Sequence, residues 1–302
     1  MKVMIFGAEG MVGSALMRRI PHAVAIGRRD ADLRDQSQVI ALMRKHKPNH
    51  VYMAAAKVGG IIANSVYPAE FIYDNLMIQS NIIHASKIYG VDQLMFLGSS
   101  CIYPKNCTQP MKEEYLFTGK LESTNKAYAV AKLTGIELCK SYNKQYGTNY
   151  ISVIPTNLYG EGDNYDLNNS HVIPALIRKI YEAKLLGEDF VEIWGTGSPM
   201  REFMHVDDLA DACCYLMKHY DDSEPINVGS GEECTIAELA IKISKIINYK
   251  GSFIFDSSKP DGVMRKLMDS SKLKKLGWSP SITLDKGLKQ TIDIRYGKSK
   301  KP

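Results

Sequence analysis

Short apolar runs alternate with longer amphipathic segments through the first half of the chain. The apolar runs predict buried β-strands over residues 2–6, 23–27, 50–56, 93–100 and 150–160. The segments between them have the length and periodicity of helices, as over residues 36–46, 70–89 and 126–146. Parallel strands need long crossover connections, which helices usually supply. The alternation therefore predicts an α/β fold built on a doubly wound parallel sheet.

The second half of the chain predicts a smaller, mixed α/β region. A helix over 172–186 leads to the strand-like "VEIWGTG" (191–197), and "MREFMHVDDLA" (200–210) then returns toward the sheet. Because the chain crosses back, a single cut does not separate the two parts. We predict a first domain of residues 1–160, joined by about 202–230, and a second region of residues 161–201 and 231–302.

Composition restricts the class of protein. The 302 residues are 45% hydrophobic and 24% charged, as in a globular chain with a large core. A net charge of +5 without a basic, aromatic-rich block gives no reason to expect a nucleic-acid partner. The six cysteines form no C-x-x-C pair, so we expect no metal site and reduced thiols, as in a cytoplasmic protein. The chain has no signal-like N-terminus and no apolar stretch of bilayer length, so we expect no membrane partner.

A glycine-rich turn joins the first predicted strand to the first predicted helix. It reads "GAEGMVG" over residues 7–13. Glycine lets the backbone approach a pyrophosphate, and the positive end of the helix dipole favours the negative charge of that group. The turn therefore predicts dinucleotide binding on a Rossmann-type sheet by Gly7, Gly10, Met11, Val12 and Gly13.

Two arginines follow the second predicted strand, where NAD-binding proteins usually carry a carboxylate. Arg28 and Arg29 can bind a 2′-phosphate in bidentate fashion, which favours NADP(H), although a solvated basic turn is the alternative. Glu9 favours NAD instead, because a carboxylate pointing at the 2′-phosphate would repel it. Asp35 is placed to meet the adenine edge.

Tyr128 and Lys132 lie four residues apart on a predicted helix and so share one of its faces. A nearby ammonium lowers the pKa of a tyrosine from about 10 toward neutral pH, which makes it a usable general acid for a carbonyl oxygen. Ser99 ends the fourth predicted strand and would complete the group at the carboxyl edge of the sheet. A chain with 17 tyrosines also produces Tyr–Lys pairs by chance.

These residues resemble the extended, nucleotide-sugar branch of the short-chain dehydrogenase/reductase superfamily. More specific segments resemble the GDP-L-fucose synthase family: "AAAKVGGI" (54–61), "YPAEFIYDN" (67–75), "GSSCIYP" (98–104), "PTNLYG" (155–160), "NSHVIPALIRK" (169–179), "MREFMHVDDLA" (200–210) and "SKPDGVMRKL" (258–267). The resemblance runs from residue 2 to about 290. It implies NADPH-dependent epimerisation at C3 and C5 and reduction at C4 of GDP-4-keto-6-deoxy-D-mannose, which gives GDP-L-fucose. It also implies a homodimer formed by helices 70–89 and 126–146.

The resemblance implies five catalytic residues. Ser99 and Tyr128 would bind the C4 oxygen, and Lys132 would bind the nicotinamide ribose. Cys101 would be the base of epimerisation and His171 the acid. A thiol titrates near about 8.5 and so can act as a base where a serine hydroxyl cannot. Taken alone, a small buried thiol and a packing or capping histidine are the alternatives.

The resemblance also implies the residues that surround the two ligands. Besides the glycine turn, the two arginines and Asp35, the cofactor would contact Leu33, Leu97, Gly98, Ser100, Lys132, Pro155, Thr156, Asn157, Leu158 and His171. The GDP-linked 4-keto-6-deoxy sugar would contact Lys179, Trp194, Arg201, Asp261, Arg265 and Lys266. Lys179 departs from the family pattern, which often has arginine there, and an ordinary charged surface is the alternative for Lys179 and Lys266.

Three other functions stay open from the sequence. One is a nucleotide-sugar 4-epimerase of the same branch, and another is a 4-keto reductase. The third is a cofactor-sensing protein without catalysis, although such a protein has no need of Ser99, Tyr128 and Lys132 together.

Overall fold

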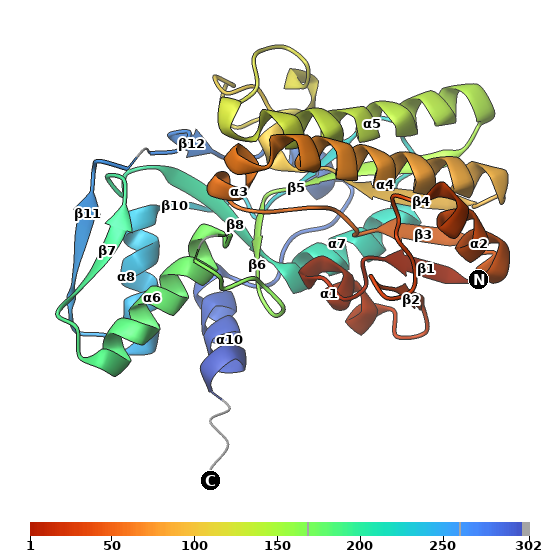
Figure 1. The fold of residues 1–302 in the computed structure, drawn as a ribbon. Helices are drawn as coiled ribbons and strands as arrows, with labels where there is room; N and C mark the ends of the chain where they lie inside the picture. The colour runs from red at the N-terminus through yellow and green to blue at the C-terminus, as the bar shows by residue number, and fades with distance from the viewer. Residues whose placement is uncertain (168, 260, 298–302) are drawn as a thin grey trace, which may run out of the picture.

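The computed structural model describes residues 1–167, 169–259 and 261–297 and contains a six-stranded parallel sheet (Figure 1). Residues 168, 260 and 298–302 of the predicted second region lie outside the described residues. The sheet has the order β2-β1-β3-β4-β5-β9, and all of its neighbouring strands are parallel. Its strands are β1 (Val3–Phe6), β2 (Val24–Ile26), β3 (His50–Met53), β4 (Gln93–Leu97), β5 (Asn149–Pro155) and β9 (Ile226–Val228). The strand order reverses between β1 and β3, and open α/β sheets bind ligands at the carboxyl end of such a switch point.

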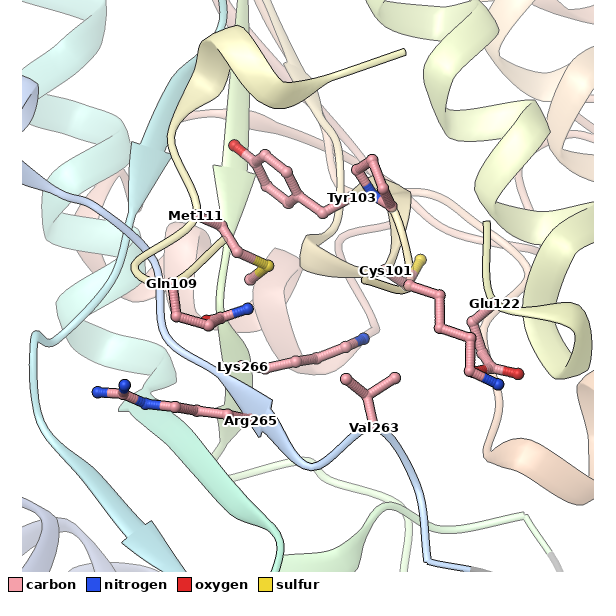
Figure 2. Close-up of a pocket in the computed structure, with 10 residues that line it drawn as sticks. Cys101, Tyr103, Gln109, Met111, Glu122, Val263, Arg265 and Lys266 are labelled. Carbon is pink, nitrogen blue, oxygen red and sulfur yellow. The ribbon is translucent and has the colours of Figure 1, made fainter. Parts of the chain in front are cut away.

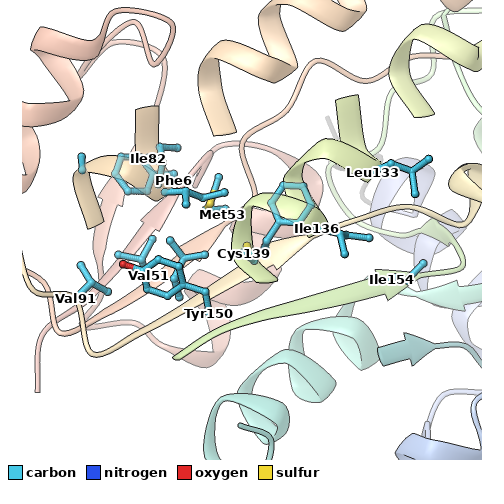
Figure 3. Packing of buried hydrophobic residues seen from close by; sticks show 14 of the residues in the cluster. Phe6, Val51, Met53, Ile82, Val91, Leu133, Ile136, Cys139, Tyr150 and Ile154 are labelled. Atoms are coloured by element: carbon cyan, nitrogen blue, oxygen red, sulfur yellow. The ribbon is translucent and has the colours of Figure 1, made fainter. Parts of the chain in front are cut away.

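Helices cover both faces of this sheet, as the doubly wound prediction requires. One face carries α2 (Gln36–His46), α4 (Pro68–Ile88) and α5 (Lys126–Tyr146), and the other carries α1 (Met11–Arg19), α7 (Val206–His219) and α9 (Ser271–Lys275). Figure 1 shows α4 and α5 side by side across their face. Figure 3 shows the apolar core beneath them, where Phe6, Met53 and Tyr150 of the sheet meet Ile82 and Ile136 of the two helices. No helix in the described ranges has both the length and the hydropathy needed to cross a bilayer.

The second part of the molecule contains shorter strands and its own apolar core. In one sheet β8 (Met200–His205) lies between β10 (Glu233–Thr235) and β12 (Arg265–Lys266), with β6 (Asn157–Tyr159) also paired to β8. A separate ribbon pairs β7 (Phe190–Trp194) with β11 (Ser252–Asp256). The helices are α6 (Val172–Leu186), α8 (Ile236–Ile247) and α10 (Leu284–Tyr296). Connections contain α3 (Ile61–Val66) and three short 3₁₀ turns, η1 (Ser100–Ile102), η2 (Glu113–Tyr115) and η3 (Ser123–Asn125).

The strand predicted over 150–160 is wrong as a single element. Its first part is β5, which pairs with β9 in the large sheet, and its last part is β6, which pairs with β8 in the small sheet. Thr156 lies at the crossing, and its backbone N–H still donates to Val228. The apolar pattern of the sequence continues through the crossing because β5 and β6 both bury apolar side chains, each in its own sheet.

The segment predicted to return to the large sheet is divided in the same way. β8 belongs to the small sheet, and only α7 and β9 join the large one. The predicted strand over 93–100 ends at Leu97. Helix α4 begins at Pro68, two residues before the predicted start, because proline suits the first turn of a helix.

Helix α5 packs so closely on β4 that it needs a glycine at the contact. A Cβ added at Gly135 would lie 2.2 Å from the ring of Phe96, which is 1% exposed. We expect Gly135→Ala to destabilise the fold by roughly 1–3 kcal/mol, because this overlap outweighs the ~1 kcal/mol that alanine gains in a helix. Urea unfolding measures the change in the free energy of unfolding.

The control is Glu137→Ala at an exposed position of the same helix, where we expect little change. A Gly135→Ala protein as stable as the parent would show that α5 can move away from β4 at no cost.

Candidate active site

Four of the five predicted catalytic residues lie together beyond the carboxyl end of β4. Ser99 precedes η1, and its hydroxyl accepts a hydrogen bond from the Cys101 amide at 3.4 Å. Tyr128 and Lys132 face the same place from α5. The Ser99 hydroxyl also lies close enough to the Tyr128 phenol and the Cys101 thiol to oppose the rise in the pKa of both groups. The arrangement offers hydroxyl donors and a thiol around one small volume.

Lys132 is buried beneath this group, and its position is set by the backbone. Its ammonium donates to the carbonyl of Leu97 at 2.8 Å and lies 5.8 Å from the centre of the Tyr128 ring. It also lies 4.9 Å from the centre of the Phe96 ring. Burial lowers the pKa of Lys132 to about 8, because the charged form loses its hydration.

The expected effect of Lys132 on Tyr128 is wrong for this structure. We expected the ammonium to lower the pKa of the phenol, but burial and the nearby Cys101 raise that pKa, and only Ser99 opposes the rise. The ammonium donates to the Leu97 carbonyl and forms no hydrogen bond with the phenol within the described residues. Tyr128 therefore keeps its proton at neutral pH, as a proton donor must.

Cys101 is 8% exposed and lines a small cavity (Figure 2). Burial raises the pKa of its thiol, which corrects the ordinary value assumed from the sequence. Three neighbours oppose this rise: Lys266 has the largest effect, followed by Ser99 and Lys132. The thiol thus lies in a desolvated place with positive charge on more than one side.

His171 is the fifth predicted catalytic residue and lies at the start of α6. It is the N-cap residue of that helix, but its side chain forms no capping hydrogen bond. Within the described ranges its ring has no hydrogen bond or ion pair at all. Burial by the surrounding protein lowers the pKa of the ring. A neutral imidazole is therefore available to a ligand.

The glycine turn after β1 fits the pyrophosphate of a dinucleotide. Gly7 has a φ of +80°, and a Cβ there would lie 2.6 Å from the backbone of Ala55, which follows β3. A Cβ on Gly13 would lie 2.0 Å from the carbonyl oxygen of Gly7. Helix α1 begins after Gly10 without a side-chain cap. The N-terminal amides of α1 can therefore face an anion at the switch point of the sheet.

The residues after β2, where the sequence predicts the ribose to bind, combine two exposed arginines with a nearby carboxylate. Arg28 and Arg29 are exposed and form no ion pair within the described residues, so both guanidinium groups are available to a phosphate. The Glu9 carboxylate accepts from the Arg28 amide at 3.3 Å, and a Cβ on Gly27 would lie 2.5 Å from its carboxyl carbon. Glu9 thus occupies the side of the site that a ribose would approach.

Asp35 has a structural role that the sequence analysis did not foresee. It is the N-cap of α2, where its carboxylate accepts from the backbone and side chains of Ser37 and Gln38. These hydrogen bonds lower the pKa of Asp35 to about 2. The oxygens assigned to an adenine edge are therefore already engaged in the helix cap. The carbonyl of Leu33 nearby accepts from Asn81 at 3.0 Å.

A residue missed from the sequence, Glu202, lies beneath the nicotinamide-side segment after β5. Its backbone carbonyl accepts from the side chains of Thr156 at 3.2 Å and Asn157 at 2.9 Å. Its carboxylate, which is completely buried, accepts from the amides of Gly231 at 2.7 Å and Met268 at 3.0 Å. A glutamate inside an apolar strand was the signal that could have identified it.

Three of the six predicted substrate residues lie near the β7–β11 ribbon. Lys179 lies 5.6 Å from the centre of the Trp194 ring and donates to the Glu192 carbonyl at 3.1 Å. Asp261 accepts from the Thr196 amide at 2.9 Å and from its hydroxyl at 2.7 Å. Trp194 is 49% exposed, so it offers a flat apolar surface to a ligand.

The other three substrate residues come from β8 and β12. Arg201 lies near Asp261, which supports its charge against burial. Arg265 pairs with Glu233 through two of its nitrogens. Lys266 points the opposite way along β12, into the cavity that Cys101 lines (Figure 2). Lys266 therefore lines the same cavity as Cys101, which we did not expect from the sequence.

Comparisons with known proteins agree with this geometry. Residues 3–229 match the NAD dependent epimerase/dehydratase family. The chain is 51% identical over 297 residues to a putative GDP-L-fucose synthase 2 of Arabidopsis thaliana, covering 97% of this chain and 90% of that protein. It is 50% identical over 304 residues to the GDP-L-fucose synthase of Escherichia coli, covering 96% of this chain and 95% of that protein. A GDP-mannoheptose C4 reductase from Campylobacter jejuni with NADP bound has a TM-score of 0.90 at 39% identity, covering 97% of both chains.

Arg28 and Arg29 generate a prediction about the dinucleotide. Replacing both by alanine should weaken NADPH binding by roughly 5- to 150-fold, because charge-assisted hydrogen bonds to the 2′-phosphate are lost. NADH lacks that phosphate, so its binding should change little. Fluorescence titration of both dinucleotides measures the two dissociation constants.

The matched variant is Glu9→Gln, which removes the opposing carboxylate and should tighten NADPH relative to NADH. An equal loss of affinity for both dinucleotides in the double variant would assign the arginines to another role.

Proposed function

The chain belongs to the NAD dependent epimerase/dehydratase family and, within it, to the GDP-L-fucose synthases, and from this premise we propose its reaction. The protein is an NADP(H)-dependent epimerase/reductase of a GDP-sugar. It inverts C3 and C5 of GDP-4-keto-6-deoxy-D-mannose and reduces C4, which yields GDP-L-fucose. The observation that carries the proposal is the group of Ser99, Cys101, Tyr128 and Lys132 beside a dinucleotide turn. NADPH, when bound, supplies the hydride for C4.

Ser99 and Tyr128 are proposed to hold the C4 oxygen of the substrate. Both C3 and C5 are α to the same ketone, so loss of either proton places negative charge on that oxygen. One pair of donors can therefore serve both inversions and the reduction. Tyr128 is protonated at neutral pH because burial raises its pKa, so it can donate its proton to the oxygen at C4.

Cys101 and His171 are proposed as the base and the acid of the inversions. A base on one face of the sugar removes the proton, and an acid on the other face returns one. The cavity at Cys101 and the free ring of His171 support this division. Without inversion, the same Ser99–Tyr128–Lys132 group can reduce a ketone, so a simple 4-keto reductase is the second candidate. The C4 reductase among the similar structures favours that candidate.

The two parts of the chain are proposed to bind different ligands. Residues 1–160 and about 202–230 would hold the dinucleotide, and the remainder would hold the sugar nucleotide, with Arg201, Lys179 and Trp194 near the GDP. We also propose a cytoplasmic homodimer. Its support is the α4–α5 layer, which exposes Tyr73, Ile88 and Tyr146, and the absence of disulfides among the six cysteines. Sedimentation equilibrium tests the dimer.

Incubation with GDP-4-keto-6-deoxymannose and NADPH tests the reaction as a whole. Formation of GDP-L-fucose, identified by NMR, is the expected result, with one NADPH oxidised for each product. A reduced product with the original configuration at C3 and C5 would favour the 4-keto reductase. Recycling of the cofactor without net oxidation would favour a 4-epimerase.

Tyr128→Phe keeps the ring but removes the proton donor. Single-turnover reduction at C4 should slow by roughly 10²–10⁴-fold, as expected for the loss of a general acid. NADPH binding should be retained, because the glycine turn and Lys132 are unchanged. Normal single-turnover NADPH oxidation by this variant would exclude Tyr128 as the acid.

Cys101→Ser is nearly isosteric, but its hydroxyl is too weak a base to form the enolate. Turnover in deuterium oxide by the parent should place deuterium at both C3 and C5. The variant should oxidise NADPH slowly and yield an un-inverted 6-deoxyhexose without deuterium at those carbons.

His171→Gln is the matched variant and should behave differently. Deprotonation can proceed while return of a proton on the opposite face stalls, so some deuterium should enter at the original configuration. Normal GDP-L-fucose from Cys101→Ser, fully deuterated at both carbons, would make Cys101 a buried packing residue.

A further inference from the structure

The proposed roles of Cys101 and His171 leave one question about the resting protein. A thiolate with an imidazolium and a thiol with a neutral imidazole contain the same number of protons. Burial favours the uncharged pair, a thiol with a neutral imidazole, because it raises the pKa of Cys101 and lowers that of His171. A base at Cys101 requires the charged pair, in which the sulfur is a thiolate. Something in the structure must therefore favour negative charge at the sulfur.

Lys266 is placed to favour a negative sulfur through its own positive charge. Its side chain extends from β12 into the small cavity that Cys101 lines from the other side (Figure 2). Its neighbour Arg265 points away and pairs with Glu233. Both residues line the cavity, but the Arg265 guanidinium is paired with Glu233, whereas the Lys266 ammonium extends toward the side of the cavity that Cys101 lines.

The Lys266 ammonium has no carboxylate partner of its own in the described ranges, where it forms no hydrogen bond or ion pair. Glu122 lines the same cavity, but its carboxylate pairs with Lys105 at 3.0 Å. Partial burial lowers the pKa of Lys266, so a thiolate across the cavity would stabilise the ammonium as much as the ammonium stabilises the thiolate. Consistent with this, each of Cys101 and Lys266 is the largest influence favouring the charged form of the other.

The other groups around Cys101 act in the same direction or are neutral. Lys132 adds a second positive charge from α5, and the nearby Ser99 hydroxyl also favours the thiolate. Tyr128 faces the sulfur as an uncharged phenol. Arg201 lies near Lys266 and opposes its charge, whereas Glu122 supports that charge. The field at the sulfur is therefore positive, and Lys266 contributes most to it.

We propose that Lys266 is the charge partner of Cys101, holding its sulfur as a thiolate so that it can act as the base at C3 and C5. This role rests on the proposed function and differs from simple binding of the substrate diphosphate. It makes Lys266 a positioning residue for a proton rather than a group that touches the reacting carbons.

Titration of the thiol in the full-length protein, without substrate, tests the proposal. The thiolate absorbance of Cys101 is obtained as the ultraviolet difference between each protein and its Cys101→Ser derivative, followed over pH. In Lys266→Met the thiol midpoint should rise by about one pKa unit or more, so the rate of iodoacetamide labelling at pH 7 should fall by roughly tenfold. Peptide mass spectrometry assigns that labelling to Cys101 among the six cysteines.

Two further variants separate charge from diphosphate binding. Lys266→Arg keeps the charge and should keep the low midpoint. Lys179→Met removes a lysine of the proposed substrate site far from the thiol and should leave the midpoint unchanged. If Lys266→Met does not fold, judged by NADPH binding and thermal unfolding, Lys266→Gln gives the same comparison with a polar side chain.

An unchanged thiol midpoint in folded Lys266→Met or Lys266→Gln would overturn the proposal, even if turnover were lost. The titration contains no sugar nucleotide, so its outcome is independent of which GDP-sugar the protein converts. A raised midpoint in a protein that makes no GDP-L-fucose would support the charge pair and contradict the proposed reaction.

Discussion

The buried carboxylate of Glu202 connects the two sheets of the molecule. It accepts hydrogen bonds from the amides of Gly231 and Met268, and its own carbonyl accepts from Thr156 and Asn157. Burying an ionisable group is costly unless its oxygens are satisfied, so these amides must stay in place for the fold to be stable. The same bonds fix the crossing from β5 to β6 and the segment that follows β12. The segment after β5 and the segment after β12 are therefore both bound to one residue.

The location of the site follows from that connection. Ser99 and Cys101 come from the end of β4, Tyr128 and Lys132 from α5, and Lys266 from the small sheet. No single element contains the whole group, so its geometry depends on how the two sheets meet. A change where the two sheets meet would alter the distance between the Cys101 thiol and the Lys266 ammonium without changing either side chain.

Desolvation determines the chemistry of these groups more than their ordinary pKa values do. Burial raises the pKa of both Tyr128 and Cys101 and lowers that of Lys132 to about 8. Burial therefore keeps a proton on the phenol, where the proposed reaction needs an acid. At the thiol, where the proposed reaction needs a base, a neighbouring positive charge has to offset the effect of burial on the pKa. In a medium of low dielectric constant such a charge acts strongly, which is why the position of Lys266 matters.

Local sequence patterns determined the parallel sheet, the covering helices and the glycine turn. Helices 36–46 and 126–146 were predicted at their observed bounds, because their periodicity and ends are set by neighbours within a few residues. The long motifs also identified Ser99, Cys101, Tyr128 and Lys132, which the fold brings together. Only the tertiary structure decided that the strand at 150–160 changes sheets and that Glu202 binds the residues at that crossing. It also decided the direction of the pKa shift at Tyr128 and the placement of Lys266 beside Cys101. These properties depend on burial and on partners far away in the chain, such as Glu202 for Thr156 at the strand crossing and Lys266 for Cys101 in the cavity, and no local pattern contains that information.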